Sequence, residues 1–341
     1  MHSKLIKFHK EATPEILELL DSLEYGTNGA IYRHLDTRER VAGVDNPLYV
    51  TLERDSKVIA NLTFCCREQG WYIRFFGFSQ KFRASDKTRR ATSNSILRKE
   101  LKQLFDDLLD EGRNELSAPL LYAYIDPQNE RSRLISGDFG FKPMSRLITQ
   151  TFSRIFPKKS VRFCQINDHS EIKEQLIGSY SSYRFFQDQT IRKGQFFGIR
   201  DRRGELIAFA RAMEVNWTII QLPGKIGKPL SRIIPYIPFI NRLLRPKKHT
   251  FLAADAVWLI HNDPALLEEL FSSLLAEKKL NLLIWWTDER DPVSKPIRKK
   301  VRWGLLDKIV GRTPVDVMIK SRDGTLLSDN KPVFVSAYDM V

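Results

Sequence analysis

The stretch 49-YVTLERDSKVIANLTF-64 decides the fold, because a related stretch, 197-FGIRDRRGELIAFA-210, occurs later in the same chain. In each, apolar residues alternate with other residues, a short charged turn follows, and a second apolar run begins. Such a pattern on both sides of a charged turn predicts a β-hairpin. The 341-residue chain is therefore expected to contain the same local structure twice.

The elements around the two hairpins also occur in the same order. Each hairpin is preceded by an expected helix and followed by a strand, a long helix and a short apolar strand. The first of these helices is expected to begin with Thr13 as its N-cap and Pro14 in its first turn. These elements are expected at residues 13–20, 71–78, 93–111 and 120–125 in the first half, and at 168–176, 251–259, 264–279 and 280–286 in the second. The repetition predicts an α/β fold with a mixed sheet in two domains, 1–157 and 158–341, the second with an insertion at about 222–249.

The composition favours anionic partners. The chain has 55 Lys and Arg against 41 Asp and Glu, which gives a formal net charge of +14 and suits phosphorylated cofactors, tRNA or an acidic membrane surface. Three cysteines without CxxC spacing indicate neither a disulfide framework nor a zinc site, and the six histidines show no metal-binding spacing. With no signal peptide and no long apolar run in the sequence, we expect a cytoplasmic protein without a metal.

A motif in the first half supports a particular fold family. The segment 122-YAYIDPQNERS-132 is followed by Phe139-Gly140-Phe141-Lys142. Together with the order of elements, this segment resembles the GNAT superfamily of acyl-CoA N-acyltransferases over about residues 5–153. The resemblance implies two GNAT-like lobes in tandem. It also implies an N-acyltransferase, in the first place an acetyltransferase, that uses acetyl-CoA or another acyl-CoA to modify a small-molecule or peptide amine.

The same resemblance places a CoA site in the first lobe. The implied pyrophosphate loop, at the start of the long helix, supplies the cofactor-binding residues Arg89, Arg90, Ala91, Thr92, Ser93 and Asn94. Cations at a helix N-terminus favour an anion on physical grounds as well. Alanine and serine stand where the family usually has glycine, which departs from its pattern. Phe78, Ser79 and Asn129 are implied to contact the rest of the cofactor, although Asn129 is equally suited to cap a helix.

Acyl transfer needs a proton acceptor for the amine and a proton donor for the leaving thiolate. Family members often carry a tyrosine seven residues after the Asn, but that position is Ser136 here. We therefore expect Tyr122 or Tyr124 to be the proton donor. Glu68 and Asp126 are the candidate proton acceptors, and the alternative is that both are exposed turn carboxylates.

The second lobe departs further from the family. Asp263 and Pro264 open its long helix, so a carboxylate is expected to cap the helix where a pyrophosphate would bind. We therefore expect no CoA binding in this lobe. Within the insertion, residues 226–248 combine apolar and basic side chains, which suits either peripheral contact with an anionic membrane or a lid on the same lobe.

Two other functions fit paired lobes of this kind. One is an aminoacyl-tRNA-dependent transferase, because Fem-type ligases also pair two GNAT-like lobes and need a basic face. The other is a GNAT-like pair that binds a protein, lipid or nucleic acid without catalysis. The acceptor amine is left open by the sequence.

Overall fold

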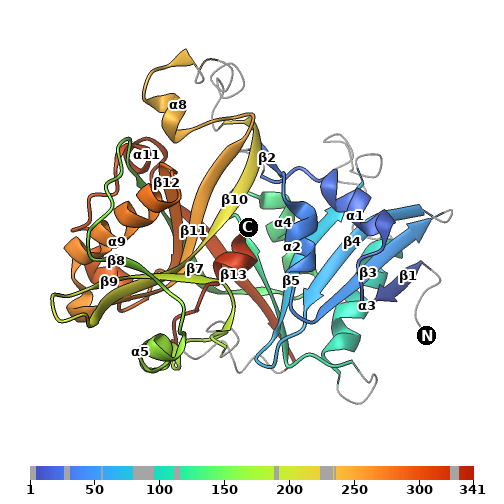
Figure 1. The fold of residues 1–341 in the computed structure, drawn as a ribbon. Helices are drawn as coiled ribbons and strands as arrows, with labels where there is room; N and C mark the ends of the chain where they lie inside the picture. The colour runs from blue at the N-terminus through green and yellow to red at the C-terminus, as the bar shows by residue number, and fades with distance from the viewer. Residues whose placement is uncertain are drawn as a thin grey trace. The chain divides into compact units, whose positions relative to one another are not determined.

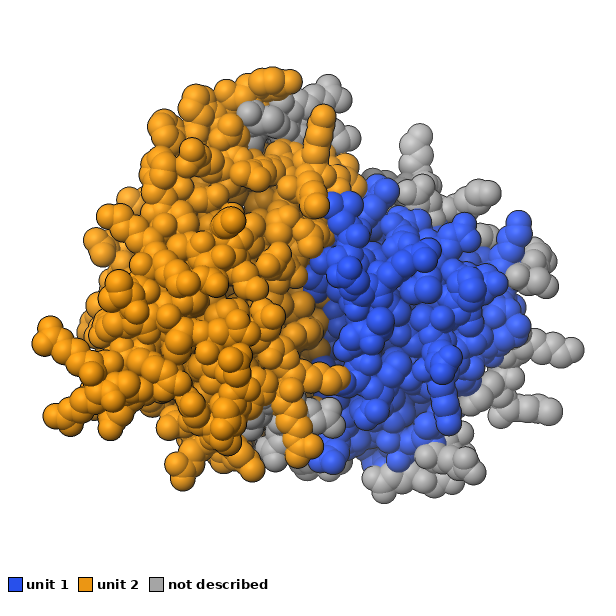
Figure 2. Space-filling model, in the orientation of Figure 1, with its two compact units in different colours: residues 1–144, 316–329 blue, residues 145–315, 330–341 orange. Residues whose placement is uncertain are grey.

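The computed structural model describes residues 5–26, 31–54, 57–79, 96–110, 116–187, 192–222, 233, 236–322 and 330–341. The chain forms two compact units (Figure 2). Unit 1 contains residues 1–144 and 316–329, and unit 2 contains residues 145–315 and 330–341.

Unit 1 is built on a mixed sheet with the strand order β1-β3-β4-β5-β6-β13 (Figure 1). The strands are β1 (Ile6–His9), β3 (Pro47–Arg54), β4 (Lys57–Cys65), β5 (Trp71–Phe78), β6 (Leu120–Ile125) and β13 (Thr313–Ser321), of which residues 316–321 belong to this unit. The pair β5–β6 is parallel and the other neighbours are antiparallel. The helices are α1 (Pro14–Asp21), α2 (Thr37–Ala42), α3 (Ile96–Leu108) and α4 (Glu130–Asp138), and a short strand β2 (Ile31–His34) lies before α2.

Helices of unit 1 cover both faces of this sheet. Leu101, Leu104 and Phe105 of α3 pack against alternate residues of β3, β4 and β6 in one apolar cluster. Residues of α1 pack with Tyr49 and Phe75 in a second cluster. Because neighbouring residues of a strand point to opposite faces, the alternation in the sequence is what separates these two layers.

Unit 2 repeats this arrangement. Its strand order is β7-β12-β11-β10-β9-β8, and only the pair β11–β12 is parallel. The strands are β7 (Lys142–Ser153, from residue 145 onward), β8 (Phe163–Ile166), β9 (Gln195–Arg200), β10 (Leu206–Gln221), β11 (His249–Leu259) and β12 (Leu282–Asp288). The helices include α5 (Ser170–Tyr180), α8 (Ile240–Leu243), α9 (Pro264–Glu277), α10 (Ser294–Ile297), α11 (Leu305–Val310) and α12 (Ala337–Met340).

The predicted repeat is present in the structure. The hairpins β3–β4 and β9–β10 are both antiparallel pairs, and each is followed by a strand, a helix and a strand in the predicted order. Thr13 caps α1 with its side chain, and Pro14 occupies the first turn, as predicted. The structure therefore has the predicted α/β class with a mixed sheet in each unit.

The compact units are interleaved along the chain. Residues 145–153 precede the predicted boundary at residue 157 but belong to unit 2, where they pair with β12. Residues 316–321 lie in the second half but belong to unit 1, where they pair with β6. Each unit thus takes one strand from the other half. The boundary at residue 157, which separates the two predicted repeats, stays a prediction.

Candidate functional site

Both units contain a parallel strand pair that stops pairing part of the way along. In unit 1, β5 and β6 pair at Trp71–Leu121 and Tyr72–Tyr122, and both strands then continue. In unit 2, β11 and β12 pair over three residues, from Leu252 to Ala254, and β11 continues to Leu259. A place where two parallel strands separate is where an α/β sheet can admit a ligand. We call the two places the unit 1 opening and the unit 2 opening.

A bulge in β5 marks the unit 1 opening. Against β4, Arg74 faces Thr63 while Gly77 faces Asn61, so β5 has one extra residue between the two pairs. Phe75 lies in this interval with φ at 50°. Left-handed backbone is uncommon outside glycine, and a bulge bends the strand that contains it. The bulge therefore accounts for the end of pairing between β5 and β6.

β11 has the same irregularity at the unit 2 opening. Arg211 of β10 faces Asp255, and Phe209 faces Trp258, which again leaves one extra residue in β11. Ala256 is the left-handed residue here, with φ at 48°. Two bulges at matching places support the internal repeat independently of the hairpins.

Buried polar side chains brace the bulge of unit 1. Asn61 Nδ2 donates to the carbonyl oxygen of Phe75 at 3.2 Å and to Thr63 Oγ1 at 2.9 Å. The guanidinium carbon of Arg74 lies 4.4 Å from the centre of the Phe75 ring. Asn61, Thr63 and Arg74 are all buried. A buried carbonyl without a hydrogen bond is costly, so Asn61 stabilises the backbone where the strands separate.

Three tyrosines lie beside the unit 1 opening. The ring of Tyr72 lies 5.3 Å from that of Tyr122 and 5.0 Å from that of Tyr124, measured between centroids. Arg67 Nη1 donates to Tyr122 Oη at 2.9 Å. Leu121, directly before Tyr122, packs in the cluster under α3, so Tyr122 and Tyr124 face away from α3. The structure therefore brings both predicted proton donors together, with Tyr122 fully buried and Tyr124 half-buried.

The two predicted proton acceptors are not brought together. Glu68 is exposed in the turn that precedes β5, whereas Asp126 is exposed directly after β6. Since β5 and β6 are parallel, these residues lie at opposite ends of the strand pair. Asp126 Oδ1 accepts from the backbone N–H of Gln128 at 2.8 Å. Asp126 is therefore at the end where the strands separate, and the catalytic roles of both residues stay predictions.

The predicted phosphate loop, Arg89 to Asn94, lies outside the described residues. Phe78 and Ser79 lie at the end of β5 beyond the bulge, and the N–H of Ser79 donates to the carbonyl oxygen of Ile59 at 2.9 Å. Asn129 Oδ1 accepts from the N–H of Ser132 at 3.0 Å and caps α4. The capping alternative for Asn129 is confirmed, and its contact with a cofactor stays a prediction.

A buried charged group that the sequence analysis did not single out follows β2. Arg40 donates two hydrogen bonds to the carboxylate of Asp36, at 2.7 and 2.9 Å, and His34 Nδ1 lies 3.7 Å from Asp36 Oδ1. The rings of Tyr25 and Tyr32 pack on His34, with centroids 4.9 and 5.7 Å away. Burial lowers the pKa of His34, and the nearby carboxylate of Asp36 opposes this shift.

Electrostatics link this buried group to the unit 1 opening. Burial raises the pKa of Tyr32 to about 12, and the negative charge of Asp126 adds to the rise. The positive charge of Arg74 contributes to the lowered pKa of His34. In the sequence, Asp36 stands two residues after His34, and Arg40 stands four residues after Asp36. This spacing resembles no metal site.

In unit 2 the chain's own C-terminal segment fills the corresponding opening. The N–H of Val333 donates to Asp288 Oδ2, at the end of β12, over 2.9 Å. The N–H of Ala337 donates to Asp255 Oδ2, in β11, over 2.6 Å. Phe334, between them, packs its ring on Tyr180 at 5.1 Å. A cavity of about 20 Å³ is left among these residues, which is close to the room that one water needs. We call residues 333–337 the plug.

A buried ion pair fixes the plug. Arg211 and Asp255 form two hydrogen bonds of 2.7 Å, and their side chains are 3% and 1% exposed. Arg211 Nη2 also donates to Ser336 Oγ at 3.2 Å, and its guanidinium lies 5.0 Å from the ring of Tyr338. The charge pair is thus satisfied on both sides, as buried charges must be. The plug is part of the core of unit 2.

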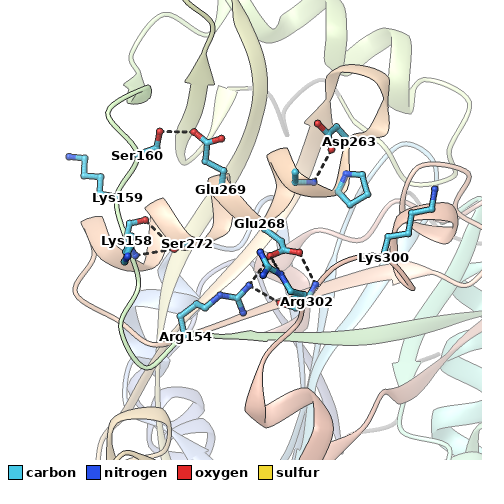
Figure 3. Close-up of a pocket in the computed structure, with 12 residues that line it drawn as sticks. Arg154, Lys158, Lys159, Ser160, Asp263, Glu268, Glu269, Ser272, Lys300 and Arg302 are labelled. Atoms are coloured by element: carbon cyan, nitrogen blue, oxygen red, sulfur yellow. Dashed lines mark hydrogen bonds and ion pairs between the residues drawn. The ribbon is translucent and has the colours of Figure 1, made fainter.

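The N-terminus of α9 is closed to an anion in the predicted way. Asp263 Oδ1 accepts from the N–H of Ala265 at 2.8 Å, and Pro264 occupies the first turn. Beside it lies a surface pocket of about 890 Å³ (Figure 3). Glu268 in this pocket accepts from the side chains of Arg154 and Arg302. The cap is confirmed, and the absence of CoA binding in this unit stays a prediction.

The described ranges contain neither a metal-binding cluster nor a membrane-spanning helix. No group of His, Cys, Asp and Glu is arranged to hold a metal ion among the described residues. In the same part of the chain, no helix combines the length and the apolar character that crossing a bilayer requires.

Comparison with known proteins was informative only at the level of structure. No family model matches the chain, and no curated protein matches it. The N-myristoyltransferase of Saccharomyces cerevisiae, solved with bound myristoyl-CoA, is similar with a TM-score of 0.53 at 9% identity. That match covers 94% of this chain and 83% of the enzyme.

Two further solved structures are similar over almost their whole length. A putative acetyltransferase from Pyrococcus horikoshii has a TM-score of 0.52 at 10% identity, with 99% of this chain and 97% of that chain covered. A tandem GNAT protein from the clavulanic acid biosynthesis pathway has a TM-score of 0.51 at 10% identity, with 92% and 98% covered. Identities this low show the fold alone. The predicted fold is confirmed: the chain has the tandem GNAT fold.

Proposed function

We propose that this chain is an N-acyltransferase in which unit 1 takes an acyl group from a CoA thioester and transfers it to an amine. The observation that carries the proposal is the contrast between two equivalent openings. In unit 2 the plug bonds to both β11 and β12 and takes up the opening. The plug is part of unit 2. We therefore assign the thioester to the unit 1 opening, which has the braced bulge and the tyrosines.

The reaction assigns a role to each group at the unit 1 opening. The amine nitrogen attacks the thioester carbonyl carbon, a C–N bond forms, the C–S bond breaks, and the CoA thiolate leaves. Backbone N–H groups at the bulge around Phe75 are suited to stabilise the oxygen of the tetrahedral intermediate. We assign protonation of the thiolate to Tyr124, because it lies beyond the last β5–β6 pair, Tyr72–Tyr122, on the part of β6 where the strands have separated. We assign the amine's proton to Asp126, at the end where the strands separate.

The cofactor and the compartment follow from the same proposal. Arg89 and Arg90 would hold the pyrophosphate, with Phe78 and Ser79 along the pantetheine arm, and acetyl-CoA is the first acyl donor to test. Unit 2 would contribute structure and acceptor recognition. The three cysteines are free thiols, which suits a reducing compartment such as the cytoplasm.

The test is the double variant Arg89→Glu with Arg90→Glu. Reversing two charges beside a pyrophosphate should weaken acetyl-CoA binding by about 100-fold or more, measured by calorimetry. The matched control is Arg202→Glu with Arg203→Glu, in the exposed turn before β10, which makes the same charge change in unit 2. Unchanged affinity in the first variant would show that the phosphate loop is assigned wrongly.

A second measurement separates the competing functions. Saturating acetyl-CoA should raise the melting temperature of the wild-type protein, because a ligand at 100 times its Kd stabilises the folded state by about 2.7 kcal/mol. A panel of longer acyl-CoA thioesters then defines the chain length. A flat response to every thioester with salt-sensitive tRNA binding would favour the aminoacyl-tRNA-dependent reaction. A flat response to both would favour a binding protein without catalysis.

A further inference from the structure

The segment between β10 and β11 is strongly basic. Residues 222–249 contain seven of the chain's Lys and Arg residues and no Asp or Glu. In Figure 1, α8 lies at the end of β10 and β11 that is far from α5. The segment therefore lies at one end of unit 2, where it connects the long strands β10 and β11.

One side of this segment is already used to hold it in place. Ile240 and Leu244 pack against Ile219 and Leu222, and Leu243 is buried. The N–H of Ile219 donates to the carbonyl oxygen of Pro246 at 2.8 Å. These contacts give the described part of the segment a defined position on β10.

The other side exposes large apolar residues. Ile233 is 54% exposed, Tyr236 84% and Phe239 56%. Phe156, which follows β7 and is 64% exposed, places its ring 6.4 Å from that of Phe239. The guanidinium of Arg242 lies 4.9 Å from the Phe156 ring. We call these four apolar residues the apolar patch.

The backbone supports a role for this exposure. Phe239 has φ at 67°, in the left-handed region that a bulky residue avoids. Such a conformation costs free energy, and it persists where the surrounding contacts demand it. Single exposed apolar residues are ordinary, but two exposed aromatic rings in contact from distant segments, Phe156 and Phe239, mark an interaction surface.

We propose that the apolar patch and the cations around it form a docking surface for an anionic lipid bilayer. Arg242, Arg245, Lys247 and Lys248 are all exposed and would face lipid phosphates, while the aromatic rings enter the headgroup region. The chemistry is complementary on both counts: the bilayer offers negative charge at its surface and hydrocarbon just below. The proposal does not depend on acyl transfer by unit 1.

A bilayer fits this surface better than a nucleic acid. Phosphate contacts alone would need only the cations, and they leave exposed Ile233 without a role. Tyr236 and Phe239 could stack on bases, but an aliphatic side chain gains little from base stacking. The mixture of aliphatic, aromatic and basic side chains is typical of shallow insertion at a membrane interface.

The experiment is sedimentation of the full chain with vesicles. One set of vesicles is phosphatidylcholine, and the other contains about one third phosphatidylglycerol to supply negative surface charge. We expect binding to the second set, at least about tenfold weaker binding to the first, and loss of binding as salt screens the charges.

Two variants test the two parts of the surface separately. Lys247→Glu with Lys248→Glu should weaken binding by at least about tenfold, since each basic residue near an anionic surface adds to the attraction. Tyr236→Ser with Phe239→Asn should weaken it by about tenfold, and Asn tolerates left-handed backbone. The controls are Arg202→Glu with Arg203→Glu, and Ile309→Asn in α11, where Ile309 is 63% exposed.

The outcomes are distinct. Weaker vesicle binding in both test variants, with unchanged binding in both controls and unchanged melting temperatures, supports the proposal. Absence of binding to anionic vesicles overturns it. So does binding of single-stranded RNA that the charge variant abolishes and the aromatic variant leaves intact, because the surface would then serve a nucleic acid. Acetyl-CoA affinity, measured on the same proteins, reports separately on unit 1.

Discussion

The two openings have similar backbone conformations but carry side chains of opposite charge. Each lies just beyond a short parallel pairing, beside a bulge with one left-handed residue, Phe75 in unit 1 and Ala256 in unit 2. The residue before the bulge is Arg74 in unit 1 and Asp255 in unit 2. Asp255 is neutralised by Arg211 and accepts from the plug, whereas Arg74 lies over an aromatic ring. The residue before the bulge therefore differs in charge between the unit 1 opening, which is suited to a ligand, and the unit 2 opening, which the plug fills.

The largest expected effect tests whether the plug is part of the core. Asp255→Ala removes the partner of buried Arg211 and an acceptor for the N–H of Ala337, so it should lower the free energy of unfolding by about 4 kcal/mol. Denaturant titration followed by Trp fluorescence measures this, because five of the six Trp residues belong to unit 2.

The matched control for this variant is Glu171→Ala, which removes an ion pair with Arg200 that is exposed to solvent. It should cost less than about 1 kcal/mol. Equal losses in the two variants would mean that the buried pair does not hold the plug, and the contrast between the two openings would lose its basis.

The second effect is a loss of stability in unit 2 at acidic pH. His249 is buried in unit 2 beside Arg245, and burial lowers its pKa to about 4. An unfolded His has a pKa near 6.5, so the unfolded chain binds more protons between these values. This group's contribution to stability is therefore complete above about pH 6.5 and is lost as the pH falls toward 4, by at most about 3 kcal/mol.

Chemical unfolding at a series of pH values, with His249→Gln as the comparison, checks this prediction. The variant should show a shallower loss of stability between pH 6.5 and 4. His34 of unit 1 also has a lowered pKa, but the nearby carboxylate of Asp36 opposes the shift. An identical pH profile for wild type and variant would contradict the assignment to His249.

The smallest effect concerns Asn129, which caps α4 in unit 1. Asn129→Ala should cost about 1 kcal/mol of stability, because the N–H of Ser132 loses its acceptor. Asn129→Ser preserves a capping oxygen and should leave the melting temperature nearly unchanged. The affinity of the Ser variant for acetyl-CoA then tests the predicted contact between Asn129 and the cofactor. Weaker binding supports the contact, and wild-type affinity contradicts it.

The local elements were predictable, and the openings were not. The hairpins follow from alternation in residues 49–64 and 197–210, and the caps of α1 and α9 follow from Thr13-Pro14 and Asp263-Pro264. The end of the β5–β6 pairing depends on the register of β4 with β5, which shifts by one residue at Phe75. A one-residue shift leaves no mark on an alternating sequence, so it could not be read in advance.

The plug and the apolar patch were missed because both rest on long-range contacts. Residues 333–337 have no motif, and they reach Asp255 and Asp288 only through the fold. Phe156 joins the apolar patch from outside the insertion in the same way. Sequence periodicity reports which face of an element is apolar, but it does not report which distant segment covers that face.

The strand exchange between the two halves has a consequence for synthesis on the ribosome. Residues 316–321 complete the sheet of unit 1 beside β6, yet they are translated after almost all of unit 2. Until they emerge, β6 has an unpaired edge, the feature from which aggregation starts. A nascent chain that contains only the first half is thus an unfinished sheet, and the order of translation makes completion of both units a late, nearly simultaneous event.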